Sequence, residues 1–245
     1  MPQTLVFDIE TRIDKELVRG VHYPDLDDDA LNADEEAYQC YLQNLTAQGR
    51  SKPFPAIIFH RPISIAIGLV GDDHSLKEVR SLGMNATPHS SKELAIEFWN
   101  YVQAGVRLIS YNGRCFDLPV LELTALHYGI PCSRYWKDGT RDRYRGQGGH
   151  LDLMDLISNV GATRAPSLHA LMLLLGYSGK DCDGSQVQAL YESGCYEAID
   201  SYCRLDVIRT YALFLRLELV RGTLSKERYR LAFDGSKPFL DQIRA

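Results

Sequence analysis

The chain has 245 residues, and its 45% hydrophobic and 24% charged content is ordinary for a globular protein that buries a full core. Its formal net charge of -5 excludes a protein-wide positive field as the means of attracting a polyanion. No apolar run approaches the roughly 20 residues that cross a bilayer, and no basic segment precedes an apolar one at the N-terminus, so we expect one cytoplasmic domain.

Strand signals come first along the chain. Apolar runs bounded by turn signals occur in three segments: residues 4–10, 63–70 and 76–82. Gly71-Asp72-Asp73 lies between the last two segments and is a turn signal, so these two strands are expected to pair antiparallel.

From residue 90 onward the hydrophobic spacing becomes helical. The segments with helical spacing are residues 91–105, 117–129, 167–176, 186–192 and 197–221. Ser90 or Ser91 can cap the first of these helices, and Ser167 can cap the third. Short buried strands are predicted over residues 107–111 and 150–156. Antiparallel strands followed by alternating strands and helices indicate an α/β fold with a mixed sheet flanked by helices.

Two segments do not fit this layout. Residues 22–59 form a long insertion, in which an acidic run at Asp25 and residues 27–29 precedes a helix predicted over residues 34–45. The insertion could gate a cleft or be a solvated helix with an acidic approach. Residues 134–149 form a basic loop that contains Arg143 and several aromatic residues, and this loop could contact a nucleic-acid backbone or simply be solvated.

Several carboxylates fall at positions that can carry chemistry. Asp8 and Glu10 are two residues apart at the end of a predicted strand, so both point to one face, where a cation or open water must relieve their repulsion. Asp117 precedes Leu118-Pro119 as a helix N-cap would, and a capping carboxylate can also serve a metal. Tyr202 and Asp206 are four apart on one helix face, as a core tyrosine above a solvated aspartate or as a catalytic pair.

The predicted layout can bring four of these carboxylates to one place: Asp8, Glu10, Asp117 and Asp206. Oxygen ligands select hard cations, so Mg²⁺ or Mn²⁺ is the expected occupant, with phosphate oxygens from a substrate completing the coordination. Two such ions ~4 Å apart would activate a water and stabilise the leaving oxygen of a phosphoryl displacement. The six cysteines include no CxxC pair, so they do not indicate a zinc site.

Three motifs resemble those of a known family. They are FDIET at residues 7–11, YNGRCFDLP at residues 111–119 and YCRLD at residues 202–206. Their order and wide spacing are similar to those of the DEDD-type 3′-to-5′ exonucleases, in the tyrosine-containing branch that includes the proofreading domains of family B DNA polymerases. The resemblance implies a ribonuclease H-like, mixed five-stranded sheet.

The resemblance also implies roles for individual residues. Asp8 would bridge two metal ions, Glu10 and Asp206 would complete the first site, and Asp117 would help to hold the second. Tyr202 would orient the attacking water. Thr11, Asn112 and Phe116 would lie against the terminal nucleotides. The local sequence, and not the resemblance, adds Lys180, after Gly179, as a candidate contact to the scissile phosphate and Arg143 of the basic loop as a candidate contact to the backbone.

The function implied by the resemblance is that of a single exonuclease domain over residues 1–245, without an accompanying polymerase domain. It would hydrolyse single-stranded nucleic acid, with DNA favoured, from the 3′ end to nucleoside 5′-monophosphates. Two alternatives stay open: an exoribonuclease, because the sequence does not locate contacts to a 2′-hydroxyl, and a non-catalytic nucleic-acid-binding module. The complete set of four carboxylates and a tyrosine favours an enzyme.

Overall fold

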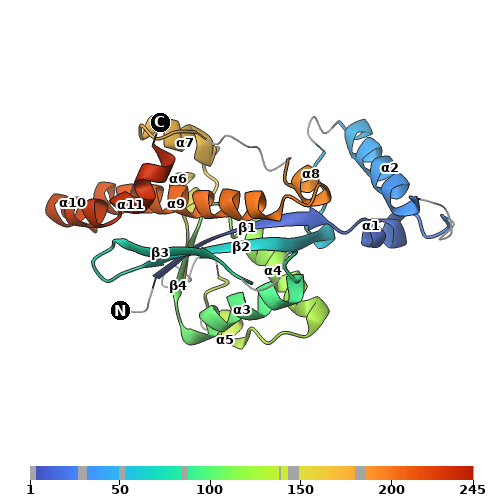
Figure 1. Cartoon of the computed structure of the whole chain (residues 1–245), viewed down its shortest axis with the longest axis horizontal. Helices are drawn as coiled ribbons and strands as arrows, with labels where there is room; N and C mark the ends of the chain where they lie inside the picture. Colours follow the sequence, from blue (N-terminus) through green and yellow to red (C-terminus); the bar gives the residue numbers. More distant parts are fainter. Residues whose placement is uncertain are drawn as a thin grey trace.

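The computed structural model describes residues 4–26, 32–49, 53–83, 88–137, 139–142, 149–179 and 186–244. Within them, a five-stranded sheet lies between two layers of helices (Figure 1). The strands are β1 (Thr4–Ile13), β2 (His60–Val70), β3 (Leu76–Ser81), β4 (Arg107–Ser110) and β5 (His150–Asp152), in the order β3-β2-β1-β4-β5. The predicted α/β class and mixed five-stranded sheet are therefore confirmed.

The central strand β1 has partners of different lengths on its two sides. It pairs antiparallel with β2 along its whole length, with a register shift between Glu10 and Thr11. On the other side it pairs in parallel with β4, but this ladder runs only from Thr4 to Val6. Beyond Val6, the β4 side of β1 has no strand partner among the described residues, and this edge is where the candidate site forms.

The helices are α1 (Lys15–His22), α2 (Ala33–Ala47), α3 (Ser91–Ala104), α4 (Asp117–Tyr128), α5 (Ser133–Lys137), α6 (Leu153–Ile157), α7 (Leu168–Leu174), α8 (Val187–Glu192), α9 (Tyr196–Val220), α10 (Lys226–Gly235) and α11 (Lys237–Leu240), with 3₁₀ turns at Ile57–Phe59 and Asp241–Ile243. Across the described ranges, none of them has the length and apolar content that a membrane span requires. The 25-residue helix α9 runs along one face of the sheet, and α3, α4 and α5 cover the other (Figure 1).

Alternating side chains of β1 decide where the carboxylates point. Leu5, Phe7 and Ile9 are buried in the apolar cluster that joins the sheet to α3 and α4. Val6 lies in the cluster on the α9 face. Because successive strand residues alternate between faces, Asp8 and Glu10 follow Val6 and face α9.

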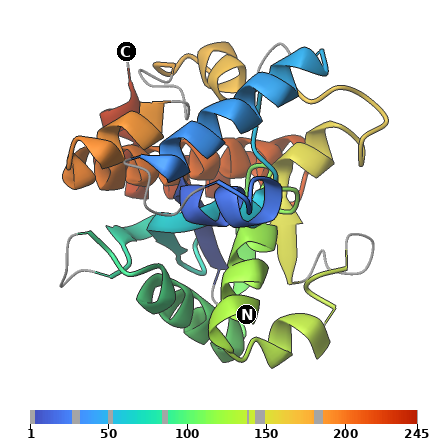
Figure 2. The same ribbon diagram turned by 90° about the vertical axis from the view of Figure 1, so that its right-hand side faces the viewer.

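The connection between β1 and β2 carries α1 and α2, which together we call the arm. The arm projects beyond the carboxyl end of β1 (Figures 1 and 2). It buries a small apolar cluster that includes Val18 and Tyr41. Lys15 bonds both Glu35 within the arm and Glu192 of α8, the latter at 2.6 Å. The helix predicted over residues 34–45 is confirmed as α2, and residues 27–29 of the acidic run lie outside the described residues.

Two predicted elements were wrong in part. The strand expected over residues 150–156 ends at Asp152, because the Asp152 carboxylate accepts a hydrogen bond from Met154 N and so begins α6. The basic loop expected over residues 134–149 begins instead as the helix α5, and residues 143–148 of it are outside the described part of the chain. Of the two serines predicted to cap α3, Ser90 is the cap, and the cap predicted at Ser167 is confirmed, since both side chains accept a backbone hydrogen bond at a helix start.

Candidate active site

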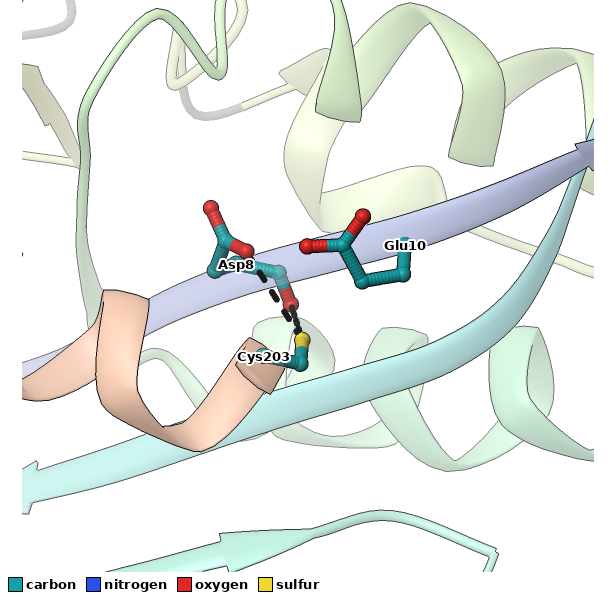
Figure 3. A group of neighbouring side chains, drawn as sticks. All are labelled: Asp8, Glu10 and Cys203. Carbon is teal, nitrogen blue, oxygen red and sulfur yellow. Dashed lines mark hydrogen bonds between the residues drawn. The ribbon is translucent and has the colours of Figure 1, made fainter. Parts of the chain in front are cut away.

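Asp8 and Glu10 form a close group with Cys203 of α9. One carboxylate oxygen from each acid and the Cys203 Sγ all lie within 4.8 Å of one another. Figure 3 shows the Glu10 side chain extended along β1 toward Asp8, and dashed lines join Cys203 of α9 to Asp8. Asp8 is half-buried and Glu10 is 9% exposed, so their mutual repulsion is only partly screened by water.

The Cys203 thiol is a hydrogen-bond donor in this group. Its Sγ lies 3.3 Å from the Asp8 backbone oxygen and 3.7 Å from Asp8 Oδ2. Burial, and then the negative charges of Asp8 and Glu10, raise the pKa of Cys203 well above its usual value. A protonated thiol does not ligate a metal, so the donors that this group offers to a cation are carboxylate oxygens. These suit a hard divalent ion such as Mg²⁺ or Mn²⁺.

Asp117 reaches the same strand from the opposite layer of helices. Its Oδ1 accepts a hydrogen bond from Ile9 N at 3.2 Å, and its side chain is buried. Ile9 lies beyond the end of the β1–β4 ladder, so its buried N–H group requires a partner from elsewhere. The prediction that Asp117 caps α4 is wrong, because Phe116 occupies the N-cap position and Asp117 is the first helical residue.

The loop before Asp117 is fixed by Asp152 at the end of β5. The two Asp152 oxygens accept hydrogen bonds from Asn112 N and Arg114 N, each at 2.9 Å. Asn112 has a positive φ of 69°, and a Cβ on Gly113 would lie only 2.6 Å from Ser110 Cβ. Burial is the main cause that raises the pKa of Asp152, against the lowering effect of these hydrogen bonds. Sequence reasoning missed Asp152, although its place at a strand-to-helix boundary was a signal.

Tyr202 and Asp206 lie on the turns of α9 next to Cys203. Since Cys203 contacts Asp8, this part of α9 is adjacent to β1. Asp206 is 2% exposed, so the alternative of a solvated aspartate is wrong. Arg209 Nη1 donates to Asp206 Oδ1 at 2.9 Å, and Arg209 Nη2 donates to Gly179 O at 3.3 Å. Arg209 was not predicted, although its three-residue spacing from Asp206 was visible.

A neutral histidine orients the hydroxyl of Thr11. His60 Nε2 lies 3.3 Å from Pro55 O, and a carbonyl oxygen only accepts, so Nε2 carries the proton. Burial lowers the pKa of His60 to about 4, so the ring is neutral near pH 7. The Thr11 hydroxyl, whose Oγ1 is 2.8 Å from His60 Nδ1, therefore donates its proton to that nitrogen.

The structure brings some of the predicted site residues together and leaves others apart. Asp8 and Glu10 are brought together, Asp117 is bonded to the residue between them, and Tyr202 and Asp206 lie on the adjacent helix. Asp117 and Asp206 are outside the close group that Asp8 and Glu10 form with Cys203. Phe116 lies at the start of α4, where its ring is 5.0 Å from the ring of His60. Lys180 and Arg143 lie outside the described residues, and the roles assigned to all these residues stay predictions.

A family model described as "Predicted 3'-5' exonuclease related to the exonuclease domain of PolB" matches residues 52–244. The matched range contains α4 and α9 and begins after β1. No curated protein matches the chain. Among solved structures, the family B DNA polymerase from the hyperthermophilic archaeon Pyrobaculum calidifontis matches with 15% identity and a TM-score of 0.51, over 89% of this chain and 25% of that chain. The chain therefore spans a quarter of the polymerase, and this likeness shows the fold, a ribonuclease H-like mixed sheet.

Proposed function

Because the chain belongs to the family of predicted 3′-5′ exonucleases related to the exonuclease domain of PolB, we propose that it removes nucleotides from the 3′ ends of single-stranded nucleic acid. DNA is the favoured substrate, and the products are nucleoside 5′-monophosphates. The observation that carries the proposal is the pairing of Asp8 and Glu10 on one face of β1, with Asp117 bonded to Ile9 between them. Three carboxylates at one strand are costly unless positive charge neutralises them.

The carboxylates are proposed to hold two divalent cations, with Asp8 common to both. Glu10 and Asp206 would complete one site and Asp117 the other. When bound, Mg²⁺ or Mn²⁺ would supply Lewis-acid activation of a water and neutralise charge on the scissile phosphate. Tyr202, four residues before Asp206 on α9, would orient the attacking water through its hydroxyl group.

Other residues of the chain would fix the direction of these side chains. The thiol of Cys203 donates to the backbone oxygen and carboxylate of Asp8. Arg209 holds one oxygen of Asp206, and Asp152 holds the loop that precedes Asp117. Such partners matter because a catalytic carboxylate contributes only when its oxygens are held in the productive direction.

The test is digestion of single-stranded DNA and RNA oligonucleotides, labelled at either the 3′ or the 5′ end, with Mg²⁺ or Mn²⁺. A 3′ label should leave at once as a mononucleotide, whereas a 5′ label should give a ladder of shortened strands, and a chelator should stop both reactions. Comparison of the rates on DNA and on RNA tests the exoribonuclease alternative.

Asp8→Asn should lower the rate by on the order of 10³-fold or more, because several kcal/mol of charge stabilisation are lost. The matched control is Asp73→Asn, in the exposed turn between β2 and β3, which should keep full activity. Chelator-resistant cleavage or full activity of Asp8→Asn would refute the mechanism. If no oligonucleotide is cut in either metal, the non-catalytic binding module becomes the better explanation.

A further inference from the structure

Three aromatic rings meet at the carboxyl end of β1. The Phe54 ring stacks on the His60 ring with centroids 5.0 Å apart and an interplanar angle of 24°. The Phe116 ring meets both edge-on, at 5.6 Å from Phe54 and 5.0 Å from His60. We call these three residues the aromatic corner.

Two residues of the aromatic corner are linked to residues next to the carboxylates in the chain. Phe116 immediately precedes Asp117, which is bonded to β1 at Ile9. His60 is hydrogen-bonded to Thr11, the residue after Glu10. A nucleoside attached to a phosphate held by Asp8 and Glu10 can meet these rings at the edge of β1 that β4 leaves open beyond Val6.

The stack runs from the core to the surface. His60 is 4% exposed, whereas Phe54 is 55% exposed. Since one face of the Phe54 ring is covered by His60, the opposite face is the one available to a ligand. An isolated exposed phenylalanine needs no explanation, but this one extends a supported stack beside a candidate catalytic group. Aromatic side chains in such positions bind nucleobases, because every base has a π-face.

Thr11 adds a polar group that fits a nucleoside at a chain end. Its hydroxyl proton is donated to His60, so toward a ligand the Thr11 oxygen is an acceptor. In DNA, internal sugar oxygens are esterified and only the terminal sugar carries a free 3′-hydroxyl that can donate. A stacking face and a hydroxyl acceptor at one place therefore match the terminal nucleoside better than an internal one.

We propose that Phe54 is the stacking platform for the base of the 3′-terminal nucleotide, with His60 supporting its ring and Thr11 accepting from the terminal 3′-hydroxyl. This inference rests on the proposed function and adds a residue from outside the three sequence motifs. Because stacking uses the π-face and not the hydrogen-bonding edge, the platform accepts all four bases.

The experiment compares single-stranded DNA carrying a normal 3′-terminal base with the same strand carrying a terminal abasic site. Release of the first nucleotide is measured with Mg²⁺ for the wild type, Phe54→Leu and Phe54→Trp. Phe54→Leu keeps an apolar side chain but removes the ring, and circular dichroism melts establish that each variant folds. The control is Tyr128→Leu, which removes a 38% exposed ring at the opposite end of α4 from Phe116.

Phe54→Leu should lower kcat/KM on the normal end roughly tenfold, the scale of one base–aromatic stack. Phe54→Trp and Tyr128→Leu should stay within about twofold of wild type. On the abasic end, wild type and Phe54→Leu should be equally slow, because the stacked base is already missing. Equal rates for Phe54→Leu and wild type on the normal end, or an equal loss on both ends, would overturn the proposal.

A binding measurement separates this proposal from the proposed function. Without metal, 2-aminopurine at the 3′ end should be quenched on binding to the wild type, and Phe54→Leu should reduce this quenching at saturation. If the wild type cuts no strand but quenching depends on Phe54, the exonuclease activity is refuted and the stacking platform stands. Quenching that does not depend on Phe54 refutes the platform.

Discussion

The face of the sheet that carries the carboxylates and the arm beyond it are held by different interactions. The helix α9 packs along β1 and β2 through a large apolar cluster that includes Val6, Val207 and Phe214. The arm buries only a small cluster around Val18 and Tyr41, and it reaches α8 through the partly exposed ion pair of Lys15 with Glu192. The carboxylates proposed to bind metal thus lie on the α9 face of the sheet, which has the larger apolar cluster, whereas changes in the arm should cost little stability.

The largest effect on stability is expected from removal of the buried ion pair on α9, which lies on the α9 face of the sheet. Arg209→Met leaves Asp206 without this partner in a site where both side chains are 3% exposed. The free energy of unfolding should fall by about 3–5 kcal/mol, as for other buried pairs that lose one member. Denaturant unfolding measures it, and Arg216→Met, on the same helix, is the control.

A double variant distinguishes loss of the pair from loss of packing. Asp206→Asn combined with Arg209→Met should cost less than the sum of the two single substitutions, because no charge is left uncompensated. Additive costs would show that the Arg209 stem, and not its charge, supports α9.

A second test concerns the loop that carries Asn112, which follows β4 and is bonded to Asp152 at the end of β5. Asp152→Ala removes the acceptor for Asn112 N, Arg114 N and Met154 N. The expected loss is about 2–4 kcal/mol, because a helix cap is lost and buried N–H groups are left unpaired. The same variant should slow hydrolysis, since this loop leads into Asp117. Asp152→Asn keeps one acceptor oxygen, so its stability and its rate of hydrolysis should lie between those of the wild type and Asp152→Ala. Wild-type stability in Asp152→Ala would contradict the proposed role of Asp152 in holding the loop.

The sequence predicted correctly those features that depend on neighbouring residues, such as the face of a strand and the start of a helix. The two-residue spacing placed Asp8 and Glu10 on one face, and the serine caps located the starts of α3 and α7. The same reasoning misassigned Asp117, because its real partner, Ile9 N, is 108 residues away and lies beyond the end of a ladder whose length the sequence does not reveal.

The aromatic corner is out of reach of sequence patterns for a similar reason. Phe54 and Phe116 are far apart in the chain, and only the return of the chain from the arm into β2 brings their rings together. Cys203 and Arg209 could have been predicted as neighbours of Asp206, because each is three residues from it on one helix.

His60 predicts how stability at the junction of arm and sheet depends on pH. Its pKa is about 4 in the folded chain against an ordinary value of 6.5, because burial disfavours the charged ring. Between pH 6.5 and pH 4 the unfolded chain binds more protons at this residue, so the free energy of unfolding must decrease as the pH falls through this window.

The contribution of His60 over the window should be up to about 3 kcal/mol, and His60→Gln should flatten this part of the curve. Denaturant unfolding at half-unit pH steps provides the measurement, and exposed His127→Gln is the control. An unchanged slope in His60→Gln would show that burial does not lower the pKa of His60 in the folded chain.

The smallest effect is expected for the arm itself, where Lys15→Met removes the ion pairs to Glu35 and Glu192. Burial alone would lower the pKa of Lys15, but its interactions with these glutamates outweigh burial and raise it. Because the glutamates are 44% and 50% exposed, the global free energy of unfolding should change by less than about 1 kcal/mol. Hydrogen exchange in α2 should nevertheless become faster, since Lys15 links the arm to α8.

Salt separates the charge of Lys15 from the packing of its stem. In 1 M salt the wild type should exchange in α2 nearly as fast as Lys15→Met, because exposed pairs are screened. Lys77→Met, which removes an exposed pair with Asp73 in the β2–β3 turn, should leave α2 unchanged. If the protection of α2 in the wild type does not depend on salt, the apolar cluster around Val18 holds the arm and the ion pairs do not. The arm and the α9 face would then differ in the size of their apolar clusters and not in the use of charge.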